Sequence, residues 1–295
     1  MALSFNRLFS HFSLTPLLRL FMDPRKPDLP DLFPNGQSVS PIHDWARRIQ
    51  AAGKEVENCF VQEIKYCKCT TSQLHEFLLV RVHYNAETTT HTAYLTLDRS
   101  PESSLDSLHS SSGELAQAAR ISSRSVPAYD RVMVSHDGTE RCVTDHQGKF
   151  DVIATMTLDR SASSSLIAFA TLADVVSAHA DYRVTRNQCY WFAFSIWGVM
   201  SDCATEISEK DKWNLRGKYV GVVLGENDSS SLSDIKTRWM VARNDVSRKT
   251  EEREQQRLAL EDQVSLLSFV IHLSHHNWDS CVKKAGNKVC NKVCR

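Results

Sequence analysis

The spacing of apolar residues changes near the middle of the chain. In the first half they form short runs, rich in β-branched side chains and bounded by polar residues, which is typical of strands. The expected strands lie at 56–66, 74–84, 92–98, 131–135 and 150–158. A further short apolar run at 218–224 predicts one more strand. We therefore expect an antiparallel sheet built from residues 56–100, 130–158 and 217–224.

The second half has the spacing of helices. Residues 164–180 repeat apolar side chains at helical intervals, and residues 190–200 are aromatic or aliphatic on nearly every face. A helix that is apolar all round is normally buried. Strands followed by helices predict an α+β fold, with the sheet packed on these two helices.

A long helix is expected at 226–272. Its first part carries the apolar stripe Ile235, Trp239, Ala242 and Val246. Residues 249–257 are wholly charged or polar, and residues 258–271 are apolar again. The first stripe should dock on the domain, whereas the last needs cover from the body or from another chain. This pattern predicts a protein partner, or self-association, through the C-terminal helix.

These elements define the expected domain organisation. Residues 1–39 read as a disordered segment with a Pro-rich linker, because five of the eight prolines lie between residues 23 and 41. The folded domain is expected at 40–225, with a serine-rich insertion at 103–125. Ser40 and Pro41 suit a helix start, and Gly53 should end that helix. A basic tail with three cysteines is expected at 273–295.

Composition narrows the class of protein. The formal charge is zero, with 35 basic and 35 acidic residues, so no overall field favours nucleic acid. Nine cysteines without a repeated spacing indicate a reducing, intracellular and cytoplasmic setting. No apolar run approaches the ~20 residues of a membrane span, so no transmembrane segment is expected. Residues 1–22 lack acidic residues, and the alternatives for them are a frayed tail, a transit peptide or a membrane-surface segment.

Cys189 is the first candidate for chemistry. Asn187 is a good N-cap, which would place Cys189 in the first turn of the apolar helix. Unpaired backbone N–H groups and the helix dipole favour an anion there, and a thiolate is such an anion. The alternative is structural, because free cysteine often packs as a small buried hydrophobe.

A thiolate nucleophile needs a base, and the base usually needs a third group that orients it. His75 begins the apolar strand 74–84. If that strand forms a hairpin with 92–98, Asp98 lies opposite Phe77 or one residue pair away, and is a diagonal neighbour of His75. His91, beside the turn, is the alternative third residue. The structural alternatives are a strand-edge histidine for His75 and a turn cap for Asp98.

Together these residues resemble a known superfamily. A histidine that opens a strand, a polar residue on the next strand and a later Asn-x-Cys at a buried helix are similar to the circularly permuted papain-like hydrolases. They resemble the lecithin–retinol-acyltransferase-like arm of the NlpC/P60 superfamily, and the aromatic run after Cys189 is also similar to fungal proteins. The resemblance implies a cysteine that attacks an acyl carbon, a histidine base and an orienting third residue. These roles would fall on Cys189, on His75, and on Asp98 or His91.

Other sites are weaker. Cys67 and Cys69 with His75 offer only three ligands in an unfamiliar spacing, and the His- and Cys-containing C-terminal region is more typical of a basic tail than of a zinc site. No Gly-rich phosphate loop is present. We expect no cofactor and no metal, and a small acyl or peptide substrate. The non-enzymatic alternative is the same fold used as a binding or scaffold module with a helical arm.

Overall fold

The structure of the 295-residue chain is a computed structural model. It describes residues 29, 31–34, 38–70, 75–85, 90–101, 128–135, 137–179, 189–219, 222–223 and 229–293. Within these ranges, the side chains of 101, 219, 222–223, 229–230 and 268–293 are not described. The expected serine-rich insertion at 103–125 lies outside the described residues.

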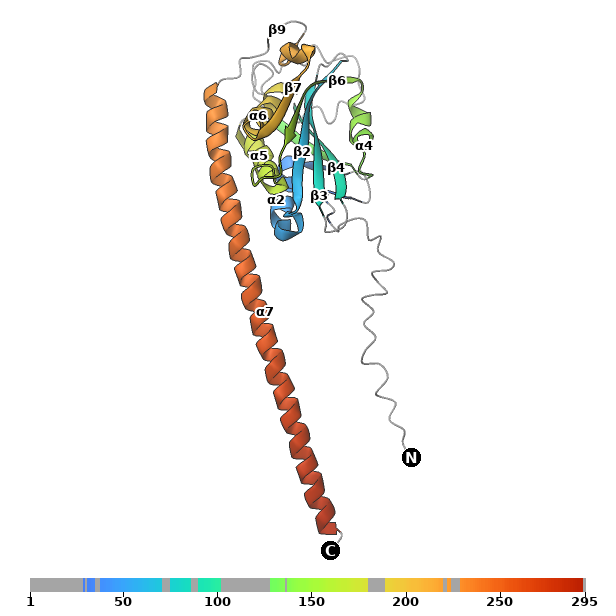
Figure 1. Ribbon diagram of the computed structural model, residues 1–295, viewed down its shortest axis with the longest axis vertical. Helices are drawn as coiled ribbons and strands as arrows, with labels where there is room; N and C mark the ends of the chain where they lie inside the picture. The colour runs from blue at the N-terminus through green and yellow to red at the C-terminus, as the bar shows by residue number, and fades with distance from the viewer. Residues whose placement is uncertain are drawn as a thin grey trace. The chain divides into compact units, whose positions relative to one another are not determined.

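The centre of the fold is an antiparallel sheet of seven strands in the order β1-β5-β4-β3-β2-β6-β7 (Figure 1). The strands are β1 (Ser38–Pro41), β2 (Cys59–Cys69), β3 (Glu76–Asn85), β4 (Thr90–Pro101), β5 (Ala128–Val134), β6 (Phe150–Leu158) and β7 (Ala204–Glu209). The α+β class predicted from the sequence is confirmed.

The two faces of the sheet are covered differently. Side chains alternate along a strand, so Leu78 and Val80 of β3 enter the large core, whereas Phe77 and Leu79 face the other side. Helices α2 (Ile42–Ala52), α5 (Leu166–His179) and α6 (Cys189–Ser201) cover the large core (Figure 1). Helix α4 (Glu140–Thr144) lies on the smaller face and is followed by the 3₁₀ turn η3 (Asp145–Gln147).

The helices follow their apolar patterns. In α2, Ile42, Trp45, Ala46 and Ile49 are buried at the i, i+3, i+4, i+7 spacing of one face. The helix ends at Gly53, as expected, where φ is +52°, a conformation that glycine adopts without strain. A second 3₁₀ turn, η1 (Gly53–Val56), follows. Helices α5 and α6 are apolar on almost every face, and both are buried.

Two strand expectations need correction. The described residues between 217 and 224 do not join the large sheet, because β8 (Lys218–Tyr219) and β9 (Val222–Val223) form a separate two-stranded ribbon. The edge strand beside β6 is β7, which precedes the 3₁₀ turn η4 (Asp211–Leu215). Most of β7 is exposed, so it lacks the apolar run that would mark it in the sequence.

The N-terminal boundary also differs from expectation. Within the predicted disordered segment 1–39, the described residues Leu29, Leu32 and Phe33 are buried in the large core. The backbone carbonyl of Asp31 accepts a hydrogen bond from Trp45 Nε1 at 3.2 Å, and its carboxylate pairs with Arg48 at 2.5 Å. The helix start lies one residue later than expected, because Ser40 and Pro41 end β1 and Pro41, in place of Ser40, is the N-cap of α2. The packed domain therefore begins by Leu29.

Helix α7 (Ser229–Val293) is longer than predicted, because it continues past residue 272 to Val293, in the segment that was expected to be a tail. The chain divides into two compact units at Arg243/Asn244, so α7 belongs to both units. In the first unit Ile235 and Trp239 are buried, and Trp239 Nε1 donates to the carbonyl of Ala168 at 2.9 Å. The expected docking of these two residues is confirmed.

The second unit carries both charged and apolar side chains on α7. Arg248 pairs with Asp245 and Glu252, and Arg257 pairs with Glu254 and Glu261, all within the helix. The large apolar residues Leu258, Leu260, Val264, Leu266 and Leu267 are 48–65% exposed. No helix among the described residues is long and apolar enough to cross a membrane.

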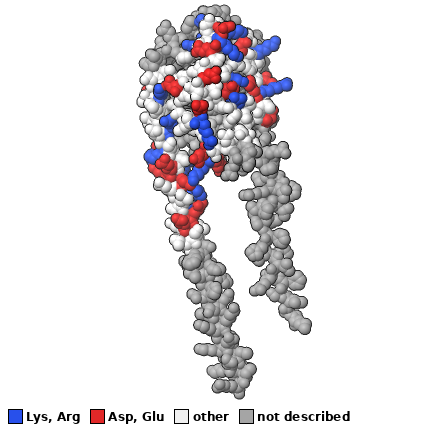
Figure 2. Space-filling model, viewed as in Figure 1, with Lys and Arg blue, Asp and Glu red and all other residues white. Residues whose placement is uncertain are grey.

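Charges of the two signs are interspersed on the face shown in Figure 2, with basic and acidic side chains side by side. This pattern agrees with the zero formal charge of the chain.

Candidate active site

His75 lies one residue before β3, at the end of the sheet. Its carbonyl accepts a hydrogen bond from the backbone N–H of Cys69 at 2.7 Å, which extends the β2–β3 pairing by one residue. Its ring stacks on Phe77, with centroids 6.3 Å apart and planes inclined by 17°. The side chain is 20% exposed, so the imidazole is fixed by packing and still reaches solvent.

Asp98 is brought to His75 by the register of the β3–β4 hairpin. Leu78 pairs with Leu97, so continuing the register by one residue sets Phe77 opposite Asp98. The register predicted from the sequence is confirmed. His75 Nε2 lies 3.8 Å from Asp98 Oδ2, an ion-pair distance that is longer than a direct hydrogen bond. The Asp98 side chain is 2% exposed.

Cys189 completes the group. It is the first residue of α6, and it lies close enough to His75 to raise the pKa of that imidazole. Trp191 and Phe192, which follow, are buried in the large core and hold the start of α6 at the end of the sheet. The unpaired N–H groups of the first helical turn favour a negative charge at this position.

The electrostatics favour a charged His75. Burial alone would lower the pKa of His75, but Cys189 and Asp98 outweigh it and raise that pKa well above its ordinary value. Burial would likewise raise the pKa of Asp98, but the nearby His75 and the doubly bonded Arg131 hold it well below its usual range. The arrangement therefore favours the protonated, charged form of His75 beside the Asp98 carboxylate.

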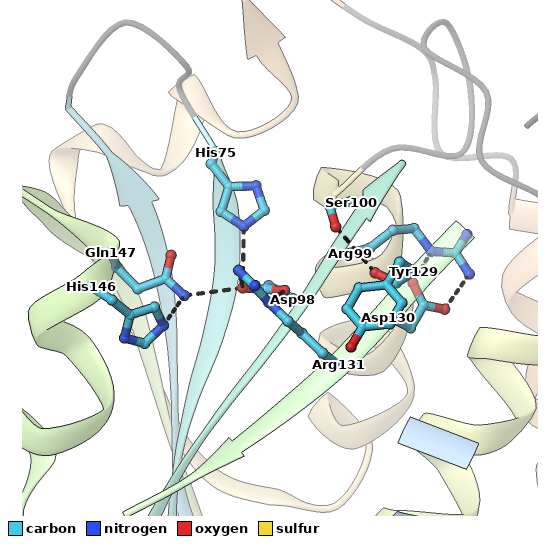
Figure 3. A network of polar contacts seen from close by, with 9 residues as sticks. All are labelled: His75, Asp98, Arg99, Ser100, Tyr129, Asp130, Arg131, His146 and Gln147. Carbon is cyan, nitrogen blue, oxygen red and sulfur yellow. Dashed lines mark hydrogen bonds and ion pairs between the residues drawn. The ribbon is translucent and has the colours of Figure 1, made fainter. Parts of the chain in front are cut away.

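Three residues of the site were not predicted from the sequence. Arg131 on β5 binds the Asp98 carboxylate with both arms of its guanidinium, at 2.7 and 3.0 Å. Gln147 Nε2, in η3, donates to Asp98 Oδ2 at 3.1 Å, and His146 contacts Gln147 at 3.2 Å (Figure 3). For Arg131 the available signal was the dipeptide Asp-Arg, which occurs at 98–99 and again at 130–131, because antiparallel pairing of two such dipeptides sets each acid opposite a base.

A second buried polar network lies on the core side of the same strand ends. We call Tyr66, Lys68 and Glu76 the Glu76 network. The Glu76 carboxylate pairs with the Lys68 ammonium, accepts from Tyr66 Oη at 2.7 Å, and accepts from the backbone N–H of Gly217 at 2.8 Å. Lys68 also donates to the carbonyl of Lys218 at 3.1 Å. The network ties the segment around Gly217 to the end of the sheet beside Cys189.

The alternative third residue is elsewhere. His91 pairs with Tyr84 near the opposite end of β3 and packs near Phe33, with ring centroids 6.1 Å apart. Nine residues of strand separate positions 75 and 84, which corresponds to about 30 Å. The structure therefore does not bring His91 to His75. The predicted helix cap Asn187 lies outside the described residues.

The cysteines considered as metal ligands are otherwise engaged. Cys67 Sγ donates to the carbonyl of Lys65, and Cys69 Sγ to that of Gln147. Among the residues that the structure describes, no group of three His, Cys, Asp or Glu side chains is arranged to hold a metal. The side chains of the C-terminal His and Cys residues, from 272 onward, are not described.

Comparison with known proteins gives no relative: no family model, no curated protein and no solved structure matches this chain. Function is therefore inferred from the geometry of the site alone.

Proposed function

We propose that this protein is a cysteine-dependent hydrolase or acyltransferase that acts on an acyl or amide bond, on a permuted papain-like arrangement of helix and sheet. Cys189 is the nucleophile, His75 the acid and base, and Asp98 the residue that orients His75. The observation that carries the proposal is the position of His75, which interacts with Cys189 and lies 3.8 Å from Asp98 Oδ2 through its Nε2. Nucleophile, base and orienting residue in one line are the requirement of such catalysis.

The reaction has two halves. The Cys189 thiolate attacks the substrate carbonyl carbon, and backbone N–H groups of the first turn of α6 stabilise the oxyanion. The bond to the leaving group then breaks, the leaving group takes the proton of His75, and a thioester remains on Cys189. Water, or an acyl acceptor, next gives a proton to His75 and attacks the thioester. The carbon–sulfur bond breaks, the product leaves, and the thiolate–imidazolium pair is restored.

Reactivity of the thiol tests the first requirement. At about pH 6, Cys189 should react with iodoacetamide faster than the other eight cysteines, by about tenfold or more. His75→Ala should abolish this advantage, and Cys189→Ala should remove the label. Peptide mapping by mass spectrometry measures each site separately. The proposal fails if Cys189 labels no faster than the half-buried Cys142, or no faster than Cys281 or Cys294.

Formation of the thioester tests the second requirement. Incubation with a p-nitrophenyl ester should add the acyl group to Cys189, with a burst of p-nitrophenolate, and hydroxylamine should remove it. Cys189→Ser should give no hydroxylamine-sensitive adduct. A reactive Cys189 that is never acylated would instead favour a binding module.

The non-enzymatic alternative has an observation of its own. Leu260, Val264 and Leu267 of α7 follow each other at intervals of four and three residues, and all are exposed. This spacing is typical of a helix face that packs against another helix. A binding or scaffold module with a helical arm would use that face and would leave Cys189 idle.

A further inference from the structure

The Asp98 carboxylate is bound mainly by groups other than His75. Its Oδ1 accepts from Arg131 Nε at 2.7 Å, and its Oδ2 accepts from Arg131 Nη2 at 3.0 Å and from Gln147 Nε2 at 3.1 Å. His75 Nε2 is farther away, at 3.8 Å from Oδ2. Figure 3 shows Asp98 between His75 on one side and Arg131 and Gln147 on the others.

The strength of the Arg131 contact explains this distance. A bidentate pair between guanidinium and carboxylate is the strong, geometrically specific form of ion pair. Asp98 is 2% exposed and Arg131 26% exposed, so water screens the contact little. Arg131 stands directly opposite Asp98 in the β4–β5 register, which fixes the fork on the carboxylate. The carboxylate is therefore held toward β5 and away from a direct hydrogen bond with His75.

We propose that Arg131 is a positioning residue that holds Asp98 back from His75 and thereby sets the upper pH limit at which the Cys189–His75 pair stays assembled. This inference rests on the proposed function. If the Asp98 carboxylate closed on the imidazole, His75 would keep its proton to higher pH. An imidazolium that holds its proton more strongly is a weaker acid toward the leaving group. Arg131 thus limits how strongly His75 holds its proton.

Other charged and titratable groups also face this part of the fold. Cys189 comes from α6, Cys69 from β2, and His146 from η3, and each interacts electrostatically with His75 or Asp98. Lys68 acts on Cys69, and it is paired with Glu76 in the Glu76 network. These residues are kept in every Arg131 variant, but Arg131 lowers the pKa of His146, so the His146 ring is followed beside the His75 ring in the same spectra.

The test is the titration midpoint of the His75 ring, followed by NMR on full-length protein with ¹³C-labelled histidine and assigned with His75→Ala. In Arg131→Met the midpoint should move up by about one pH unit, because Asp98 loses its cation and can close on His75. Arg131→Lys keeps the charge but loses the two-armed contact, so it should move the midpoint up by less than Arg131→Met does. Arg248→Met, which removes an exposed arginine from the second unit, is the matched control and should have no effect.

A double replacement separates positioning from simple charge. In an Asp98→Asn background, Arg131→Met should move the midpoint by less than half as much, because no carboxylate remains to close on the ring. An equal shift in both backgrounds, or no upward shift, overturns the proposal. If Arg131→Met does not fold, Arg131→Gln and the same double variant repeat the comparison. Failure of the proposed function is a different result, namely labelling of Cys189 that does not depend on His75.

Discussion

At the residue scale, Asp98 makes the free energy of unfolding depend on pH in the acid range. Its pKa is held below the ordinary carboxyl value by His75 and Arg131, so its contribution is complete above about pH 4 and is lost as the pH falls below it. His75 has the opposite sign: its raised pKa stabilises the folded state below about pH 6.5, and that contribution is lost as the pH rises through the folded value.

We therefore expect Asp98→Asn to flatten the acid side of the stability curve. Urea unfolding at pH values from about 3 to 7 measures it, as the slope of the free energy of unfolding against pH. Asp151→Asn is the control, because Asp151 forms an exposed ion pair with Lys212. Equal slopes in the wild type and in Asp98→Asn would contradict the assignment.

The Glu76 network gives a second expectation at this scale. Glu76→Gln leaves the nearly buried Lys68 ammonium without its counter-ion and should lower the free energy of unfolding by about 3–5 kcal/mol. The double variant Glu76→Gln with Lys68→Met removes both charges, so it should cost less than the sum of the two single variants. Urea unfolding of the three variants gives the coupling, and additive losses would show that the pair is not a unit.

The site could be predicted in part because its geometry is local. His75 and Asp98 meet through a single hairpin, whose register follows from two adjacent strands. Cys189 was identified by its place at the start of an apolar helix. Arg131 and Gln147 could not be placed, because their contacts depend on the order of strands across the sheet, and the spacing of apolar residues does not determine that order.

At the scale of elements, the first turns of α7 are a structural part of the domain. Trp239 is 3% exposed and hydrogen-bonded to Ala168, so Trp239→Ala should lower the free energy of unfolding by about 3–5 kcal/mol. The neighbouring Met240 is 42% exposed, and Met240→Ala should change the free energy of unfolding by less than about 1 kcal/mol. Thermal melts of the two variants measure the difference, and similar melting temperatures would show that the docking contributes little.

The elements differ in how far the sequence revealed them. Strands β3, β4 and β6 carry continuous or alternating apolar residues and were predicted near their observed bounds. Strand β7 is exposed at five of its six residues, and β1 has only four residues, so neither has an apolar pattern. Both strands are held by backbone hydrogen bonds to a neighbouring strand, and such bonds leave no pattern in the residues of the strand itself.

At the scale of the whole molecule, the two units should separate cleanly. Truncation after Arg248 keeps Ile235 and Trp239 and removes the exposed leucines of α7. We expect a folded, soluble domain that no longer self-associates, because those apolar residues are the candidate contact between copies. Light scattering and thermal melts measure both properties, and an insoluble product would show that the removed helix covers the domain.

Truncation before Ile235 is the matching control. It removes the docked turns as well and should lower the melting temperature, because the groove that holds Trp239 loses its cover. An unchanged melting temperature would show that the domain does not need this helix.

The two ion pairs between β4 and β5 have a further consequence for how the chain finds its fold. No tight turn joins these strands, since residues 102–127 lie between them, and a long connection does not select a register. Asp98 pairs with Arg131 and Arg99 with Asp130. A slip of one residue in one direction would set Asp98 against Asp130, and a slip in the other would set Arg99 against Arg131. Both shifted registers place like charges opposite each other, which is unfavourable. The two ion pairs therefore favour the observed β4–β5 register over the two registers that differ from it by one residue.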